Sequence, residues 1–250
     1  MKISLITVSY NSAATIQTTL DSVAAQRYPD LEYIIVDGGS KDATLDIVNQ
    51  YKDLITVCIS EPDKGIYDAM NKGVQRATGE VIGILNSDDF YLNSNVLREV
   101  SELFAADPTV EVLLGDVDFV DDHDLNRPVR HYRTGNFHPW MFRFGLMPPH
   151  PAVFVRKEAY DQAGLYKPGY KIAADFDLLA RLLVGGAKYQ AVHKTWVRMR
   201  TGGASTSGLK SMITITREMK RSLQENGLYS NSLMLMLRLP FKLLTQVLGK

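Results

Sequence analysis

The sequence is poor in cysteine and carries no excess of charge of either sign. Cys58 is the single cysteine among 250 residues, and 28 basic side chains balance 28 acidic ones. One cysteine excludes an internal disulfide, a Cys-rich zinc site and a CxxC redox pair, which is typical of a reducing cytoplasm. A neutral chain also argues against a general nucleic-acid binder, which needs an excess of Lys and Arg to neutralise phosphates.

Long hydrophobic runs are also missing. No apolar stretch reaches the roughly 20 residues that cross a bilayer. The opening "MKISLITVSYNS" turns polar at Ser9, before the apolar core of a signal peptide would be complete, and it therefore predicts a first strand. With 45% hydrophobic residues, the chain should form one large globular α/β domain, with or without an appendage, and no integral membrane protein.

Two periodicities alternate along the first part of the chain. Short runs rich in β-branched residues predict strands at 2–8, 32–37, 54–59 and 80–85. Apolar residues at helical spacing predict helices between them, at 12–26, 40–51 and 65–79. Asn11 or Ser12 is expected to cap the first helix, and Gly79 to end the third. This βαβαβαβ order predicts a largely parallel sheet with flanking helices.

The part of the chain after residue 95 is less regular. Further strands are expected at 111–117, 151–155 and 188–199, and a helix at 173–183. Between 133 and 151, the sequence "RTGNFHPWMFRFGLMPPHP" is aromatic and contains prolines without a clean period. Such a segment predicts a long functional loop or a mobile flap.

Polar residues follow each of the first four predicted strands. The four loops read "SYNS", "DGGSKD", "SEPDKG" and "NSDD". Each loop alone is ordinary turn chemistry. In open parallel sheets, however, ligands bind beyond the carboxyl ends of the strands, so four polar loops at one edge indicate a ligand site.

The last of these loops ends in two adjacent carboxylates, Asp88 and Asp89. Two such charges at the end of a buried strand repel each other, and an unpaired buried charge is costly. One interpretation is a helix N-cap followed by an acid in the first turn. The other is a divalent cation, since Mg²⁺ and Mn²⁺ prefer carboxylate and phosphate oxygens. With the neighbouring polar loops in view, we favour the cation.

Motifs along the chain resemble those of glycosyltransferase family 2. They span about residues 3–205 in the family's order: "TVSYNS", "VDGGSKDAT", "SEPDKGIYDAMNKG", "GEVIGILNSDD", "ADFDLLARL" and "RTGGAS". The chain looks most similar to bacterial enzymes that build exopolysaccharide, capsule or O-antigen. The resemblance implies a GT-A fold with a mostly parallel central sheet, a nucleotide-diphosphate sugar donor, a divalent metal (Mn²⁺ or Mg²⁺) and inversion at the anomeric carbon.

The resemblance also implies roles for individual residues. Asp89 is the implied direct metal ligand, and Asp88 the implied contact to the ribose or the donor sugar. His150 could ligate the same cation or contact the diphosphate, although a histidine flanked by prolines is as often structural. Donor contacts are implied for a larger set: Thr7, Tyr10, Asn11, Asp37, Asp63, Asp68, Asn71, Lys72, Asp88 and Arg200.

Three positions of this set carry further expectations. The family motif after the second strand often reads Asp-Asp, but here Gly38 follows Asp37, which leaves the nucleobase open. Lys72 is equally well explained as a residue on a solvated helix face. Arg200, followed by "TGGAS", is expected to reach the diphosphate from a flexible loop that closes over the donor.

Asp175 is the candidate general base. The family motif usually reads Glu-Asp, and here Ala174 replaces the glutamate while Asp175 is kept. An inverting transfer needs one carboxylate that takes the proton of the acceptor hydroxyl. The alternative is an acid in the first turn of a helix. Asp177 should point elsewhere on the same helix and form a salt bridge.

The tail from residue 207 onward combines basic and apolar residues, as in "SLMLMLRLPFKLLTQVL". A basic amphipathic segment suits an anionic membrane surface, with Leu233 and Leu235 inserted and Arg238 at the head groups. Pro240 should divide it into two helices. The alternative is a helix packed on the catalytic domain or across a homodimer.

The expected organisation is a catalytic domain over 1–206 followed by the amphipathic segment 207–250. The catalytic domain should divide into a nucleotide-binding half at about 1–95 and an acceptor-binding half at about 96–206. The predicted protein is a cytoplasmic, metal-dependent, inverting glycosyltransferase, peripheral on the inner face of the plasma membrane. It would pass a sugar to a hydroxyl of a lipid-linked glycan.

Two other functions compete with this prediction. A sugar-nucleotide nucleotidyltransferase should carry a glycine-rich, basic phosphate loop after the first strand, and "SYNSAAT" has none. A non-catalytic glycan-binding or assembly module could keep the same fold, but the intact Asp88, Asp89 and Asp175 argue against it.

Overall fold

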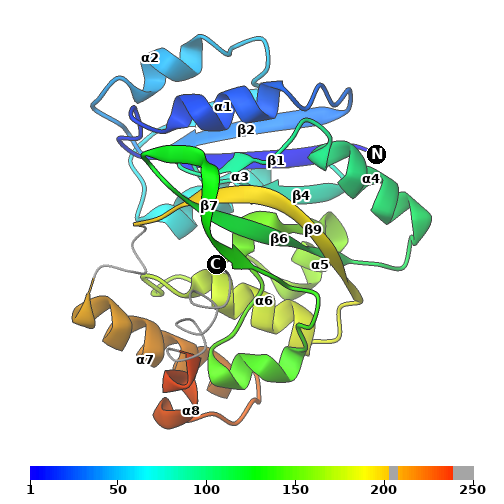
Figure 1. Ribbon diagram of the computed structural model, residues 1–250, viewed down its shortest axis with the longest axis vertical. Coiled ribbons are helices and arrows are strands. Elements are labelled where there is room, and N and C mark those ends of the chain that lie inside the picture. The colour runs from blue at the N-terminus through cyan, green and yellow to red at the C-terminus, as the bar shows by residue number, and fades with distance from the viewer. Residues whose placement is uncertain (203–207, 239–250) are drawn as a thin grey trace.

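The computed structural model describes residues 1–202 and 208–238 and has a central sheet with helices on both faces (Figure 1). Its strands are β1 (Ile3–Ser9), β2 (Leu31–Asp37), β3 (Val57–Ser60), β4 (Val81–Ile84), β5 (Phe90–Tyr91), β6 (Val112–Asp121), β7 (Asp124–Tyr132), β8 (Val153–Arg156) and β9 (Tyr189–Arg200). Its α-helices are α1 (Ile16–Ala24), α2 (Thr44–Asn49), α3 (Ile66–Arg76), α4 (Val96–Ala106), α5 (Lys157–Ala163), α6 (Ala174–Val184), α7 (Leu209–Glu225) and α8 (Ser232–Met236). Two 3₁₀ helices are η1 (Pro139–Phe144) and η2 (His150–Ala152).

The described strands form one sheet in the order β3-β2-β1-β4-β8-β6-β9-β5, and β7 pairs with β6. The half built from β3, β2, β1 and β4 is parallel, as the βαβ order predicts. In the other half, β8 is antiparallel to both β4 and β6, while β9 runs parallel to β6. The predicted α/β fold is therefore confirmed, and the second half of the sheet is mixed.

Both faces of the sheet are buried because alternate residues of its inner strands enter two hydrophobic cores. On β1, Ile6 and Val8 join the core that includes α3, α5 and α6. Ile3 and Leu5 join the other core, which includes α1, α2 and α4. A strand that is covered on both faces needs apolar residues at nearly every position, which explains the continuous runs in the sequence.

Several predicted helix ends are wrong. Neither Asn11 nor Ser12 caps α1, whose N-cap is Thr15 without a side-chain hydrogen bond. α3 ends at Arg76, before Gly79. A Cβ at Gly79 would lie 2.7 Å from Ser4 N, and Gly79 N donates to Ser4 Oγ at 2.8 Å. Gly79 therefore allows the chain to approach β1 closely and is not a helix cap.

The aromatic segment 133–151 packs into the protein and is not the predicted flap. Phe142 of η1 is fully buried, and its ring contacts Phe137 and Phe176 edge-on at centroid distances of 5.3 and 5.1 Å. The Tyr132 hydroxyl donates to Met147 O at 2.8 Å. The segment forms only two short 3₁₀ helices, η1 and η2, which explains why it lacks an α-helical or strand period.

The C-terminal helices pack on the catalytic domain. Ile215, Met219 and Leu223 of α7 are buried in the core that includes α6. Leu235 and Arg238 are buried as well, so the expectation that they face a membrane is wrong. Arg238 donates to Thr216 Oγ1 at 3.0 Å. The predicted division at Pro240 lies outside the described residues.

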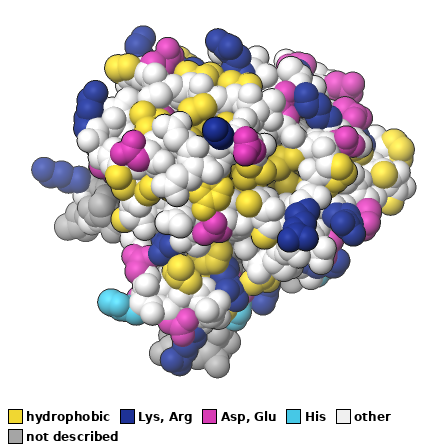
Figure 2. Space-filling model, turned by 90° about the horizontal axis from the view of Figure 1, so that it is seen from above, with side chains coloured by type: hydrophobic (Ala, Val, Ile, Leu, Met, Phe, Trp, Pro, Cys, Tyr) yellow, Lys and Arg dark blue, Asp and Glu magenta, His cyan; other side chains and the backbone are white. Residues whose placement is uncertain are grey.

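No helix among residues 1–202 and 208–238 is both long enough and apolar enough to cross a bilayer. Figure 2 views the molecule from above Figure 1, and basic and acidic side chains are interspersed over that face. On this face, as in the whole sequence, neither basic nor acidic side chains dominate.

Candidate active site

The carboxyl ends of β1, β2 and β3 lie level, because Ser9 pairs with Asp37 and Asp37 with Ser60 in register. Asp37 is fully buried and accepts hydrogen bonds from the hydroxyls of Ser9, Ser40 and Ser60, at 3.1, 2.5 and 2.8 Å. Burial would raise the pKa of Asp37, but these hydrogen bonds hold it below its ordinary value. Asp37 thus organises the sheet edge and points away from solvent.

A cleft of about 1340 Å³ opens at this edge. Of the residues predicted from the sequence, it is lined by Tyr10, Asn11, Asp63, Asp88, Asp89 and Arg200. Residues from the loops after β1, β3 and β4 line it, and β6, β7 and the end of β9 close it from the other half of the sheet. Three of the four polar loops that the sequence places after the strands, those after β1, β3 and β4, therefore meet in one cavity.

Asp88 and Asp89 lie on the floor of the cleft, directly after β4. Asp89 is buried, with an exposed fraction of 2%, and its Oδ2 accepts a hydrogen bond from Asn86 Nδ2 at 3.0 Å. Burial and, second, the charge of Asp88 raise the pKa of Asp89 well above its ordinary value. Burial also raises the pKa of the half-buried Asp88. Two buried like charges make this a site that a cation would stabilise.

Asn86 adds an oxygen that the sequence analysis did not assign. Its Oδ1 is buried in the cleft wall and has no hydrogen-bond partner among the described residues. Hard cations bind carboxylate and amide oxygens, so Asp88, Asp89 and Asn86 Oδ1 form a chemically suitable donor set. No group of three or more His, Cys, Asp or Glu that could hold a metal occurs in the described part of the chain, so remaining ligands would come from a bound molecule.

Arg200 enters the cleft from the end of β9. Its side chain bridges Asp122 Oδ1 at 2.7 Å and Thr18 Oγ1 at 3.1 Å, while its buried Nε donates to no described residue. The Arg200 charge also favours ionised Asp88 and Asp89. A guanidinium held this way beside two carboxylates can pair with an anionic ligand.

Arg130, on β7, is a cleft residue that sequence reasoning missed. Its guanidinium lies 3.7 Å from the centroid of the Phe119 ring, and both residues line the cleft. Burial lowers the pKa of Arg130. The sequence analysis assigns no strand to 124–132, because this stretch carries few apolar residues.

Gly38 lies close to two cleft residues, Tyr10 and Asp63. A Cβ at Gly38 would clash with Asp63 Oδ2 and lie 3.3 Å from the Tyr10 ring. Asp63 Oδ1 accepts from Gly65 N at 2.8 Å, and the Tyr10 side chain is 63% exposed. Asp63 therefore occupies the space beside Asp37 that a second acid after β2 would need.

Five predicted donor contacts do not line the cleft, namely Thr7, Asp37, Asp68, Asn71 and Lys72. Thr7 is fully buried and accepts a hydrogen bond from Tyr33 OH at 3.0 Å. Asn71 holds the backbone of Tyr166 with two hydrogen bonds, of 2.8 and 2.9 Å. Lys72 pairs with Glu61 at 2.8 Å and with Asp68 at 3.7 Å. The contacts of Asn71 and Lys72 are those of residues that hold α3 and the loop before it in place.

Asp175 lies in the first turn of α6, next to α3, and is not among the lining residues. Its Oδ1 lies 3.3 Å from the hydroxyl of Tyr67, which follows the cleft residue Ile66. Burial raises the pKa of Asp175 to about 6. A carboxylate with such a pKa is ionised at neutral pH and basic enough to accept a proton. Asp177 pairs with Arg181 at 2.8 Å, as predicted.

His150 does not reach the cleft. Its Nε2 lies 2.5 Å from the Tyr166 hydroxyl, and both side chains are buried. Burial lowers the pKa of His150 to about 4, so the imidazole is neutral. The surroundings support the structural alternative for this residue.

Comparison with known proteins shows the family to which the chain belongs. The model of "Glycosyl transferase family 2" matches residues 4–161. A "PGL/p-HBAD biosynthesis glycosyltransferase" of Mycobacterium bovis (strain BCG / Pasteur 1173P2) is 32% identical over 181 residues, 71% of this chain and 68% of the relative. "UDP-Glc:alpha-D-GlcNAc-diphosphoundecaprenol beta-1,3-glucosyltransferase WfaP" of Escherichia coli is 26% identical over 224 residues, 87% of this chain and 85% of the relative.

Solved structures share the fold. Residues 1–349 of S. aureus TarS in complex with UDP-GlcNAc superpose with a TM-score of 0.71 at 20% identity, covering 89% of this chain and 66% of that one. "Mannosyltransferase PcManGT from Pyrobaculum calidifontis in complex with GDP-Man and Mn2+" gives 0.65 at 19% identity, covering 90% and 63%. The chain thus spans just under two thirds of these solved chains. The family match over most of its length shows that this chain belongs to glycosyl transferase family 2.

Proposed function

We propose that this chain transfers a sugar from a nucleotide diphosphate to a hydroxyl of a glycan acceptor, with inversion at the anomeric carbon. The carrying observation is the group of cleft residues Asn86, Asp88, Asp89 and Arg200, in which the Arg200 charge favours the ionised form of both carboxylates. This arrangement suits a compact anion that arrives with a cation. The family match and the relatives' names support the reaction class.

The donor end of the proposed site is the corner of Tyr10, Asn11 and Asp63. The exposed Tyr10 ring offers a surface on which a nucleobase can stack. Asn11 has a left-handed backbone with φ of 49°, and its Oδ1 accepts from Lys41 N at 2.8 Å, so it fixes the loop after β1 to the loop after β2. The relatives' ligands, UDP-GlcNAc and GDP-Man, support a nucleotide sugar without naming the one used here.

Asp89, Asp88 and Asn86 are the residues that would hold Mn²⁺ or Mg²⁺. The cation would supply neutralisation of the charge that grows on the leaving diphosphate. Arg200, which lines the cleft, would pair with the same diphosphate. The Mn²⁺ complex of PcManGT supports this assignment by fold alone.

Asp175 would act as the general base. Its carboxylate takes the proton of the acceptor hydroxyl as that oxygen bonds to the anomeric carbon and the bond to the diphosphate breaks. Attack from the face opposite the diphosphate inverts the configuration. The contact of Asp175 with Tyr67, which follows the cleft residue Ile66, and its raised pKa of about 6 support this role.

The proposed acceptor is a lipid-linked sugar, because the name of WfaP specifies a diphosphoundecaprenol acceptor. Nucleotide sugar and lipid-linked glycan would meet at the cytoplasmic face of a membrane. The loop after β1 is polar and not basic, which disfavours a nucleotidyltransferase. The half-buried Asp88 and the buried Asp89 cost stability without a ligand, which disfavours a non-catalytic module.

A ligand panel tests the donor assignment. Thermal shift assays should compare four nucleotide sugars in millimolar Mn²⁺ and in EDTA: UDP-glucose, UDP-GlcNAc, GDP-mannose and dTDP-rhamnose. At least one nucleotide sugar should raise Tm when Mn²⁺ is present and not when EDTA is present. A ligand at about 100 times its Kd adds roughly 2.7 kcal/mol to the free energy of unfolding. A folded protein that no nucleotide sugar or nucleotide diphosphate stabilises would contradict the proposed function.

Membrane docking is proposed for the surface between α7 and α8. A groove of about 460 Å³ is lined by Met212, Ile213, Thr216, Arg217, Lys220, Ser232, Met236 and Arg238. Around it Ile213, Leu233 and Leu237 are 58, 73 and 50% exposed. Arg217 and Lys220 make no ion pair with any described residue. Exposed apolar and unpaired basic side chains on one surface fit an anionic bilayer.

The substitution Lys220→Glu tests this docking. A basic residue near an anionic surface contributes about 1 kcal/mol, so reversing its charge should weaken binding roughly 30-fold. Flotation with phosphatidylglycerol vesicles measures the effect, and phosphatidylcholine vesicles show the neutral baseline. Lys52→Glu, just after α2 at the opposite end of the molecule in Figure 1, is the matched control. Equal binding of both variants and the wild type would contradict docking by this surface.

A further inference from the structure

The N-terminus of α6, which carries Asp175, receives its cap from another helix. Its own N-cap residue, Ala173, has no side-chain hydrogen-bonding group. The Glu218 carboxylate of α7 instead accepts three backbone hydrogen bonds, from Lys171 N at 2.7 Å, Ile172 N at 3.0 Å and Ala173 N at 2.9 Å. A carboxylate at this position also matches the positive end of the helix dipole.

The same turn is held from the opposite side by α3. The Tyr67 hydroxyl donates to Ile172 O at 2.5 Å and lies 3.3 Å from Asp175 Oδ1. The Tyr67 ring stacks on Tyr166 at a centroid distance of 5.6 Å, which fixes its orientation. Asp175 therefore follows a turn that is clamped between α3, next to the cleft, and α7.

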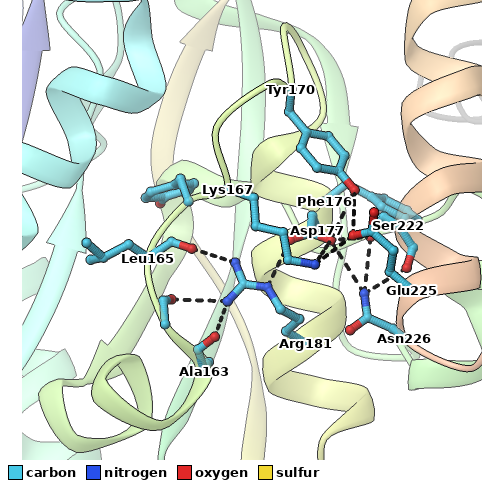
Figure 3. A network of polar contacts seen from close by, with 12 residues as sticks. Ala163, Leu165, Lys167, Tyr170, Phe176, Asp177, Arg181, Ser222, Glu225 and Asn226 are labelled. Carbon is cyan, nitrogen blue, oxygen red and sulfur yellow. Dashed lines mark hydrogen bonds and ion pairs between the residues drawn. The ribbon is translucent and has the colours of Figure 1, made fainter.

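A second polar network fixes α7 against α6 (Figure 3). Asp177 is fully buried and accepts from Ser222 Oγ of α7 at 2.8 Å, while Arg181 of α6 pairs with its other oxygen at 2.8 Å. Ser222 lies one helical turn after Glu218, so both residues face α6. This contact sets the rotation of α7 that directs Glu218 at the turn.

We propose that Glu218 is a positioning residue for the transfer reaction. By fixing the backbone of residues 171–173, it holds the Asp175 carboxylate at the distance and angle that the acceptor hydroxyl requires. This inference rests on the proposed function, in which Asp175 is the base. It makes α7, which the sequence suggests is an appendage, a part of the catalytic unit.

The charge of Glu218 gives the proposal a second readout. The titratable groups that face Asp175 are Tyr67 of α3, Tyr166 of the loop before α6, and Glu218 of α7. Burial is the main reason that the pKa of Asp175 is raised, and the Glu218 charge raises it further. Removing that charge should lower the pKa of Asp175.

The test compares Glu218→Gln with Glu225→Gln. Glu225 lies two turns along α7 and pairs with Lys167 and Arg221, but it does not contact residues 171–173. With a UDP-sugar that stabilises the protein and a GlcNAc-diphosphoundecaprenol acceptor, Glu218→Gln should lower kcat about 10- to 100-fold while the KM for the UDP-sugar stays within twofold. Glu225→Gln should keep both constants.

Two measurements need no turnover. In Glu218→Gln, the amides of residues 171–175 should exchange with deuterium at least tenfold faster, and the ¹³C carboxyl titration of Asp175 should move to lower pH. Unchanged exchange and titration in Glu218→Gln, or equal changes in Glu225→Gln, would overturn the proposal. Asp175→Asn separates the two ideas: if that variant keeps full turnover, the base assignment fails, whatever Glu218 does to the turn.

Discussion

Asp175→Asn should lower kcat by about 100- to 10,000-fold and leave nucleotide-sugar binding within twofold of the wild type. The variant keeps the shape of the side chain but cannot take a proton from the acceptor hydroxyl, and general-base catalysis accounts for rate factors of this size. Asp175 does not line the cleft, so donor affinity should not depend on it. Single-turnover kinetics and calorimetric titration with the UDP-sugar measure the two quantities separately.

The pH dependence offers a direct check of the same assignment. Because the pKa of Asp175 is about 6, kcat/KM of the wild type should fall tenfold per pH unit below that value. The raised pKa also means that the folded state disfavours the charged form, so stability is lost as pH rises through 6. Asp175→Asn should therefore be at least as stable as the wild type at pH 8.

Asp161→Asn, an exposed change on α5, is the control for Asp175→Asn. It should leave kcat and the pH profile unchanged. A wild-type profile that is flat from pH 5 to 8, or turnover above a tenth of wild type in Asp175→Asn, would show that Asp175 is only the first-turn acid of α6.

Asp89→Asn should abolish the effect of Mn²⁺ on donor binding. A cation held by Asp89 supplies several kcal/mol of charge neutralisation, so the affinity for UDP or GDP in Mn²⁺ should fall at least 100-fold. Titration calorimetry with Mn²⁺ and with EDTA measures this difference. Wild type should show a large gap between the two conditions, and the variant should show almost none.

The same substitution should not damage the fold. Burial raises the pKa of Asp89 well above its ordinary value, so its charge costs folding free energy once the pH exceeds that pKa. The uncharged amide removes this cost, and the unpartnered Asn86 Oδ1 can accept its hydrogen bond. Ligand-free Tm at pH 8 should therefore hold or rise. An affinity that is independent of both EDTA and residue 89 would rule out the metal assignment.

The sequence predicted the parallel half of the sheet well, because β1, β2 and β4 are covered on both faces and their apolar runs are unambiguous. It also located the cleft, since the residues after parallel strands must share one edge. β7 was not predicted. Its exposed and half-buried residues, "DLNRPVRHY", carry little apolar signal, and a proline such as Pro128 is rare inside a strand.

The contacts around the predicted site residues could not be predicted from spacing. The resemblance implies donor contacts for Asp37, Asn71 and Lys72, yet their side chains pair with Ser60, Tyr166 and Glu61. Motif spacing fixes the position of a residue along a strand or helix, whereas its partner depends on how α3 packs against the loop near Tyr166. The role of Glu218 could not be predicted from the sequence for the same reason, because its three hydrogen-bond partners lie more than 40 residues away.

The corner of Gly38 and Asp63 has a consequence for how members of this family can differ. A side chain at position 38 must displace the Asp63 carboxylate, so the two positions hold one carboxylate between them. Exchange of the loop after β2 for one that carries an acid at 38 must therefore also move the Asp63 carboxylate, and it should succeed more readily when the loop after β3 is exchanged with it. The two loops would then change together among members of the family.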